Sequence, residues 1–201
     1  MDNPQTFCEQ VKRFWCNIGV FTKFMFLINL FSFIIQNGVM AYMFNETKEP
    51  NFDPVALCVT GVIDENQWYR LFSSEITHGS LGHILANMSM FLVWGTELEK
   101  HYGTLFYAAI NLQLCLLSNL MSMGVSLFQT YYLKHTVFGY EIGGFDQLMK
   151  CAVGYSNILF GIMMLEALMG GERYQSVFGI VKVKKVYVPA IMMIIIQISM
   201  P

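Results

Sequence analysis

The sequence predicts an all-α fold: a bundle of helices that crosses a membrane several times. Of the 201 residues, 55% are hydrophobic and only 13% are charged. The apolar residues are concentrated in long runs, several of them close to the ~20 residues that span a bilayer, instead of following the one-sided pattern of a surface helix. Together these observations favour a polytopic membrane protein over a soluble domain.

Five apolar segments are predicted as transmembrane helices, at about 19–44, 81–98, 104–128, 149–169 and 186–200. The last is short for a span of ~20 residues. No cleavable signal peptide is evident near the N-terminus. We therefore expect residues 1–18 to form a cytosolic tail and residues 19–201 to form one membrane domain.

The connecting segments set the predicted orientation. Residues 45–76 mix aromatic, basic and polar side chains, as expected of an element at the lipid headgroup level, and 129–148 is predicted to be a second non-spanning loop. The N-terminal side of the membrane receives seven basic residues: Lys12, Arg13, Lys100, Arg173, Lys182, Lys184 and Lys185. The opposite side receives four: Lys48, Arg70, Lys134 and Lys150. The positive-inside rule then places the N-terminus in the cytosol.

Charge and cysteine usage argue against several classes of protein. The net charge of −2 gives no nucleic-acid footprint. The five cysteines are scattered without a CxxC pair, so we expect neither a disulfide framework nor a zinc site. Charged groups on a midplane pathway are few and no inverted repeat is visible, which disfavours a transporter or channel. We expect no metal and no cofactor.

Polar residues inside the second apolar segment form two helical stripes. His83 and Asn87 are four residues apart and share a face. They are either hydrogen-bond links between helices or a functional site, since polar groups within a membrane are costly. Gly95, Glu99 and Gly103 have the same spacing, which predicts close helix approach and a bond from Glu99 to a neighbouring helix.

The fourth apolar segment contains Ser156 within "GYSNILFG". A serine in a transmembrane helix commonly bonds its own backbone, so alone it is a weak signal. In combination with an imidazole and an amide on another helix, it suggests a nucleophile that faces an oxyanion site.

These motifs, in this order, resemble those of the rhomboid intramembrane serine proteases. The motifs are H-x4-H-x3-N-M (His78, His83, Asn87, Met88), G-x3-E-x3-G (Gly95, Glu99, Gly103) and G-x-S (Gly154, Ser156). Upstream, "QWYRL" with Trp68 and Arg70 resembles the Trp-Arg motif of the family's first loop. The stretch "CAVGYSNILF" is similar to eukaryotic rhomboid-domain proteins of the endoplasmic reticulum.

The resemblance implies a role for each residue. Ser156 corresponds to the nucleophile, His83 and Asn87 to the oxyanion hole, and His78 to the histidine about one turn earlier. Structural roles are implied for Gly154, for the loop residues Trp68 and Arg70, and for Gly95, Glu99 and Gly103. The implied mechanism needs neither metal nor cofactor.

Two departures from the family pattern are visible. Asn157 follows the serine where the family usually has glycine, and we expect its bulk to crowd the helix behind it. The family's general base is a histidine on a sixth helix, in a Gly-His-x-x-Gly context, and the chain ends at Pro201 before such a helix. We therefore expect five of the six core helices, and no base for Ser156 within this chain.

The resemblance implies an intramembrane serine endopeptidase that cleaves single-pass membrane proteins within or near the bilayer. The alternative is a pseudoprotease that binds membrane clients and affects their trafficking or degradation. The absent base and Asn157 favour the alternative, whereas the retained Ser156, His83 and Asn87 favour the enzyme. The expected partners are transmembrane proteins and the bilayer. The expected location is the endoplasmic reticulum or Golgi, in preference to the plasma membrane or mitochondrion.

Overall fold

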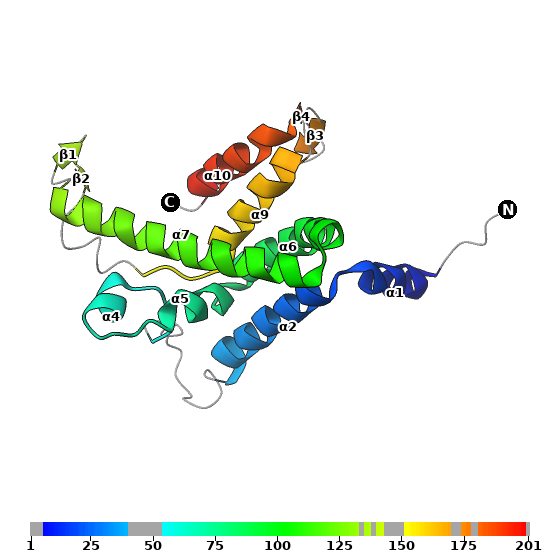
Figure 1. Cartoon of the computed structure of the whole chain (residues 1–201), viewed down its shortest axis with the longest axis horizontal. Coiled ribbons are helices and arrows are strands. Elements are labelled where there is room, and N and C mark those ends of the chain that lie inside the picture. Colours follow the sequence, from blue (N-terminus) through cyan, green and yellow to red (C-terminus); the bar gives the residue numbers. More distant parts are fainter. Residues whose placement is uncertain are drawn as a thin grey trace.

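The predicted all-α fold is confirmed. The computed structural model describes residues 6–39, 54–132, 135–137, 140–142, 151–169, 174–177 and 181–199. Its long elements are helices packed as a bundle, and its strands are confined to two small hairpins (Figure 1).

The helices follow one another with short connections. They are α1 (Phe7–Asn17), α2 (Val20–Ile34) with a π-helical extension η1 (Ile35–Val39), α4 (Val59–Ile63), α5 (Arg70–Ser73), η2 (Ser74–Ile76), α6 (Leu81–Tyr102), α7 (Thr104–Tyr132), α9 (Ser156–Met169), η3 (Lys185–Tyr187) and α10 (Val188–Ser199). Antiparallel hairpins are formed by β1 (His135–Val137) with β2 (Tyr140–Ile142), and by β3 (Tyr174–Val177) with β4 (Val181–Lys184).

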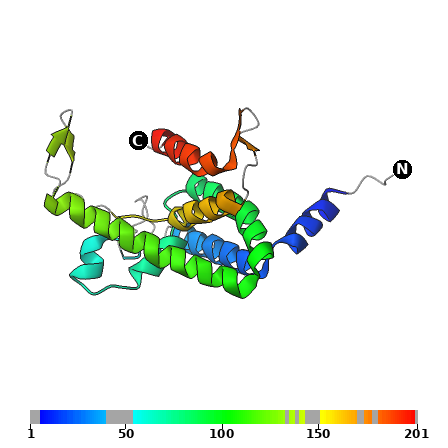
Figure 2. The same ribbon diagram turned by 45° about the horizontal axis from the view of Figure 1, so that its top comes forward.

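The core lies where α6, α7 and α9 meet. Phe91 of α6, Tyr107 of α7 and Ile162 of α9 are completely buried there, together with Tyr155 just ahead of α9. The rings of Phe91 and Tyr155 meet edge to face with centroids 4.8 Å apart, a favoured aromatic geometry. Figures 1 and 2 show α2 and α9 on either side of α6, so this core fixes the start of α9 against α6.

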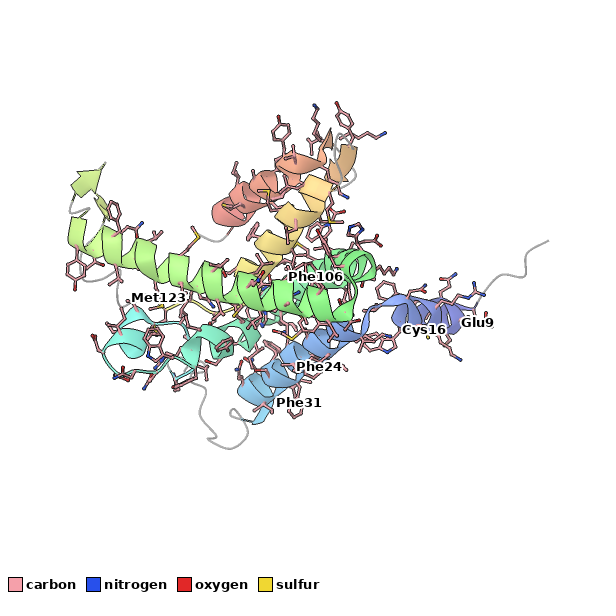
Figure 3. The ribbon with its side chains drawn as sticks, in the orientation of Figure 1. Glu9, Cys16, Phe24, Phe31, Phe106 and Met123 are labelled. Atoms are coloured by element: carbon pink, nitrogen blue, oxygen red, sulfur yellow. A yellow bond between two sulfur atoms is a disulfide. The ribbon has the colours of Figure 1, made fainter. Side chains whose placement is uncertain are left out.

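Two helices are long and apolar enough to cross a membrane, within the part of the chain that the structure describes. They cover Val20–Gly38 and Thr104–Tyr131, and only 11% and 22% of their most apolar windows are buried in the protein. The core helix of a soluble protein would be mostly buried. Here Phe24, Phe31 and Phe106 are 57%, 66% and 59% exposed (Figure 3), so these apolar faces are available to lipid.

The polar ends of the sequence segments differ from the prediction in three places. Helix α7 continues to Tyr132, past the start of the predicted loop at 129, and the predicted 170–185 loop contains the β3–β4 hairpin. The predicted N-terminal tail contains α1, which begins with a capping box between Thr6 and Glu9. No residue of α1 is buried, and the helix projects from the bundle (Figures 1 and 2).

The first loop, described from residue 54 onward, is tightly folded. Arg70 is only 7% exposed and donates to the carbonyl oxygen of Ala56 at 2.8 Å and to Oε1 of Gln67 at 2.6 Å. Gly61 lies directly against it, because a Cβ there would be 2.7 Å from Arg70 Nε. Trp68 is 52% exposed, as a side chain at the headgroup level would be.

The expectation that the cysteines form no disulfide is wrong. Cys58 and Cys151 are bonded, with a sequence separation of 93 residues. The fold brings them together because the first loop and the segment ahead of α9 pair through an isolated bridge between Leu57 and Ala152. Spacing along the chain carries no sign of so distant a partner.

Candidate active site

The start of α6 presents the two predicted oxyanion donors. Ser80 caps this helix, and its side chain accepts a hydrogen bond from the backbone N–H of His83. His83 lies in the first turn and Asn87 one turn later, on the same face. The sequence interpretation of a shared face is therefore matched by the helix that forms.

Gly154 joins this face to the start of α9. A Cβ at Gly154 would lie 2.5 Å from Cε1 of His83 and 3.5 Å from Nδ2 of Asn87, and its φ of 114° is one that side chains rarely adopt. Glycine thus permits the imidazole and the amide to approach the backbone two residues before Ser156. The structure brings together the residues that the resemblance assigns to one site.

His78 supports the donor face from behind. It is completely buried, and Nδ2 of Asn87 lies 3.1 Å from its Nε2. Since the amide nitrogen can only donate, Nε2 of His78 accepts and the imidazole is neutral. Burial, with a contribution from neighbouring His83, lowers the pKa of His78 to about 4. One amide proton of Asn87 is thus used by His78, and the other is free to meet an oxyanion.

Three connections hold the segment ahead of Ser156 to the first loop. They are the Cys58–Cys151 disulfide, the Leu57–Ala152 bridge, and a 2.8 Å hydrogen bond from the backbone N–H of Gly154 to the carbonyl oxygen of Ser74. The loop therefore fixes the approach to α9 through covalent and backbone contacts.

Ser156 is half-buried and is the first residue of α9. Among the residues that the structure describes, its hydroxyl has no hydrogen-bond partner. Both of its neighbours are anchored on α7: Tyr155 Oη donates to Oδ1 of Asn111 at 2.6 Å, and Asn157 Nδ2 donates to Oδ1 of Asn119 at 3.1 Å. The nucleophile candidate is held in place by its neighbours while its own hydroxyl stays available.

The expected crowding by Asn157 does not occur. Its side chain pairs with Asn119 in a buried polar chain, because Nδ2 of Asn119 also donates to Glu75 Oε1 at 2.7 Å and to the Leu71 carbonyl oxygen at 2.8 Å. Sequence reasoning missed Glu75 and Asn119. The signal for Asn119 was an amide within an apolar segment, where polar groups are costly.

The other end of α6 carries the second predicted stripe. Glu99 accepts hydrogen bonds from the backbone N–H groups of Phe21 and Thr22, both at 2.9 Å, and from the hydroxyls of Thr22 and Thr104, both at 2.8 Å. It therefore caps the N-terminus of α2 from another helix, and the cap residue Gly19 leaves room for it, because a Cβ there would lie on the carboxylate.

The two glycines of this stripe do different things. A Cβ at Gly95 would be 2.9 Å from the Tyr107 hydroxyl, so this position does allow a close approach between α6 and α7. At Gly103 the expectation of close approach is wrong, since a Cβ would meet nothing within 4 Å. Gly103 instead ends α6 with a φ of 79°.

Within the described ranges, no group of three or more His, Cys, Asp or Glu side chains is arranged to hold a metal ion. The chemistry that these residues offer is that of a hydroxyl opposite an imidazole and an amide.

Comparison with known proteins agrees with this geometry. The Rhomboid domain family model matches residues 65–201. Rhomboid-like protein 15 of Arabidopsis thaliana is 30% identical over 175 residues, covering 84% of this chain and 40% of that protein. Rhomboid-related protein 4 of Rattus norvegicus is 31% identical over 101 residues, covering 50% of this chain and 29% of that protein.

The chain thus spans less than half the length of these relatives. The family match covers the loop motif, both stripes of α6 and the Gly154–Ser156 segment, so the resemblance drawn from those residues is confirmed. With its apolar, outward-facing helices, this chain belongs to the rhomboid family and is an integral membrane protein.

Proposed function

We propose that this chain is an intramembrane serine endopeptidase that acts on single-pass membrane proteins. The observation that carries the proposal is the contact of Gly154 with His83 and Asn87, which sets two side-chain donors beside the residue that precedes Ser156 by two. A hydroxyl with an imidazole and an amide at this spacing is suited to acyl transfer.

In the proposed reaction, Ser156 Oγ attacks the scissile carbonyl carbon and the carbonyl oxygen becomes an oxyanion. The free N–H of Asn87 and an N–H of His83 donate to that oxyanion, and the N-terminus of α9, at which Ser156 lies, adds a positive dipole end. Each donor of this kind contributes roughly 10²–10³ in rate.

The serine proton needs an acceptor. By resemblance this is the histidine of a Gly-His-x-x-Gly sequence on a sixth helix, and residues 1–201 contain no such sequence. After attack, that imidazolium would protonate the leaving amine, and water would release the acyl group by the same route. His101 is a poor substitute, because it lies 18 residues from His83 along α6, about 27 Å away.

The disulfide supports the proposed orientation. Cys58 follows the first span and Cys151 precedes the fourth, so the two residues share one side of the membrane. Disulfides persist in oxidising compartments, and this side is the one that the basic residues leave outside the cytosol. We place it in the lumen of the endoplasmic reticulum or Golgi.

The test compares three proteins in liposomes with a single-pass substrate. The 201-residue chain should be inert, a form extended by a helix with the Gly-His-x-x-Gly sequence should cleave, and Ser156→Ala in that form should abolish cleavage. Labelling of Ser156 by a fluorophosphonate should follow the same order, because an unassisted serine is a weak nucleophile. An extended form that binds the substrate and never cleaves it would support the client-binding pseudoprotease instead.

A further inference from the structure

The proposed mechanism leaves one buried acidic group without a task. Glu75 lies in η2, three residues before His78, and only 3% of it is exposed. Its Oε1 accepts the hydrogen bond from Asn119, while Oε2 has no partner among the described residues. A buried carboxyl in this position is costly unless it serves the site beside it.

The hydrogen bonds from Glu75 lead to the residue next to the nucleophile. Asn119 donates to Glu75 with one N–H, and its Oδ1 accepts from Nδ2 of Asn157. The chain therefore runs from η2 through α7 to the first turn of α9. Glu75, Asn119, Asn157 and Ser156 also line one small cavity of about 30 Å³.

We propose that Glu75 is a positioning residue for Ser156, acting through Asn119 and Asn157 and competent when its carboxyl is neutral. This rests on the proposed function, because it concerns the orientation of the same nucleophile. The hydrogen bonds fix the first turn of α9 relative to α7, and with it the direction of the Ser156 side chain toward His83 and Asn87.

The neutral form follows from the surroundings of Glu75. Burial raises the pKa of its carboxyl to about 7, with the hydrogen bond from Asn119 acting in the opposite direction. The titratable groups that face it are the Cys115 thiol on α7 and the Tyr155 phenol ahead of α9, while α2 presents the amide of Gln36 to η2. An ionised Glu75 would place a buried negative charge beside the cavity that Ser156 lines, and would oppose an oxyanion there.

The first experiment needs no protease activity. In the 201-residue chain with Cys8→Ser and Cys16→Ser, a Ser156→Cys thiol reports its own position through its rate of reaction with a methanethiosulfonate reagent. Glu75→Leu and Asn119→Leu should each change that rate by about tenfold, since small misplacements alter reactivity strongly. Glu75→Gln should stay close to the parent rate, because its amide oxygen can still accept from Asn119.

Two controls separate positioning from general damage. Glu166→Gln removes a carboxyl that pairs with Lys185 near the other end of α9, and should leave the rate unchanged. In an Asn157→Ala background, Glu75→Leu should have no further effect, since the link to α9 is already absent. Intact Cys58–Cys151 disulfides and cooperative melting show that each variant is folded. Equal thiol rates in all folded variants would overturn the proposal.

The second experiment uses the extended, cleaving form. Asn119→Leu should lower kcat about tenfold with KM unchanged, as expected when only the transition state loses support. Above pH 7, Glu75→Gln should keep a kcat that the parent loses. Parallel pH profiles of the two would overturn the role of the neutral carboxyl. If the extended form does not cleave at all, the proposed function fails, and the thiol experiment still decides whether Glu75 positions residue 156.

Discussion

The two ends of α6 use their polar residues in opposite ways. At one end, Glu99 accepts four hydrogen bonds from α2 and α7. At the other end, His78 has a buried Nδ1 with no partner among the described residues, and Asn87 has spent one N–H of two. A polar group that spends its bonds inside the fold stabilises it, whereas one that keeps a bond free can serve a substrate. The comparison separates roles that residue type alone does not.

The largest expected effect tests the free end. In the extended form, Asn87→Ala should lower kcat by about 10²–10³-fold, the usual cost of one oxyanion donor. The melting temperature in detergent should change little, because the helix face of Asn87 is already shaped for a ligand. Cleavage kinetics and thermal melting of the same preparation check this. A large loss of melting temperature at unchanged kcat would place Asn87 in the structural class with Glu99.

The disulfide comes next. Cys58→Ser with Cys151→Ser should reduce the free energy of unfolding by about 2–4 kcal/mol, because the bond closes a long loop. The matched control is Cys115→Ala, which removes a buried thiol that makes no disulfide. Denaturant melts with and without reductant measure the effect. If reductant leaves the parent's stability unchanged, the covalent link adds nothing to the Leu57–Ala152 bridge.

At the satisfied end, Glu99→Ala should cost about 2–3 kcal/mol, since hydrogen bonds to a charged group are the stronger kind. The N-terminus of α2 would then carry unpaired N–H groups at Phe21 and Thr22. The remaining folded fraction should still label with a fluorophosphonate in the extended form. Loss of labelling per folded molecule would mean that the two ends of α6 are coupled.

How far the sequence could go is visible in the same helix. The spacing of His83 and Asn87, and their pairing with Ser156, followed from helix geometry and the family resemblance. The partners of Glu99 did not, because Phe21 and Thr22 lie 78 and 77 residues away. Contacts of this kind depend on how helices are arranged, which periodicity along one helix does not specify.

The same limit explains the two largest surprises. Asn157 was expected to crowd α9, but its partner Asn119 is 38 residues away on α7. Cys58 and Cys151 are 93 residues apart. In contrast, α1 was missed although its signal is local: Thr6 and Glu9 form a capping box directly ahead of an amphipathic run.

A pH experiment distinguishes two groups at the free end that shift in opposite directions. The pKa of His78 is lowered from 6.5 to about 4, so its contribution to stability is present above pH 6.5 and lost as the pH falls toward 4. The pKa of Glu75 is raised from 4.5 to about 7, so its contribution is present below pH 4.5 and lost as the pH rises through 7.

Relative to the parent, His78→Gln should therefore gain melting temperature at pH 4, and Glu75→Gln should gain it at pH 8. Melting curves of the three proteins between these values check the signs. Gains in the same direction for both variants would show that one of the two groups is not the titrating one.

The smallest effect separates the two glycines of the satisfied end. At Gly95 the constraint is space, because a Cβ would be 2.9 Å from the Tyr107 hydroxyl and 3.1 Å from Phe91. At Gly103 the constraint is the backbone, whose φ of 79° and ψ of 157° lie in a region that is almost exclusive to glycine. Both Gly95→Ala and Gly103→Ala should cost about 1–3 kcal/mol, so the alanine variants alone do not tell the two causes apart.

Leucine tells them apart. Gly95→Leu should cost clearly more than Gly95→Ala, since each added carbon must displace Tyr107 or Phe91. Gly103→Leu should cost about the same as Gly103→Ala, because nothing lies within 4 Å of a Cβ there. Gly103→Asn should bring no relief, since the ψ of 157° is outside the left-handed helical region that asparagine tolerates. If the cost at position 103 rises with side-chain size, then another helix approaches that position in the membrane, as the stripe in the sequence predicts.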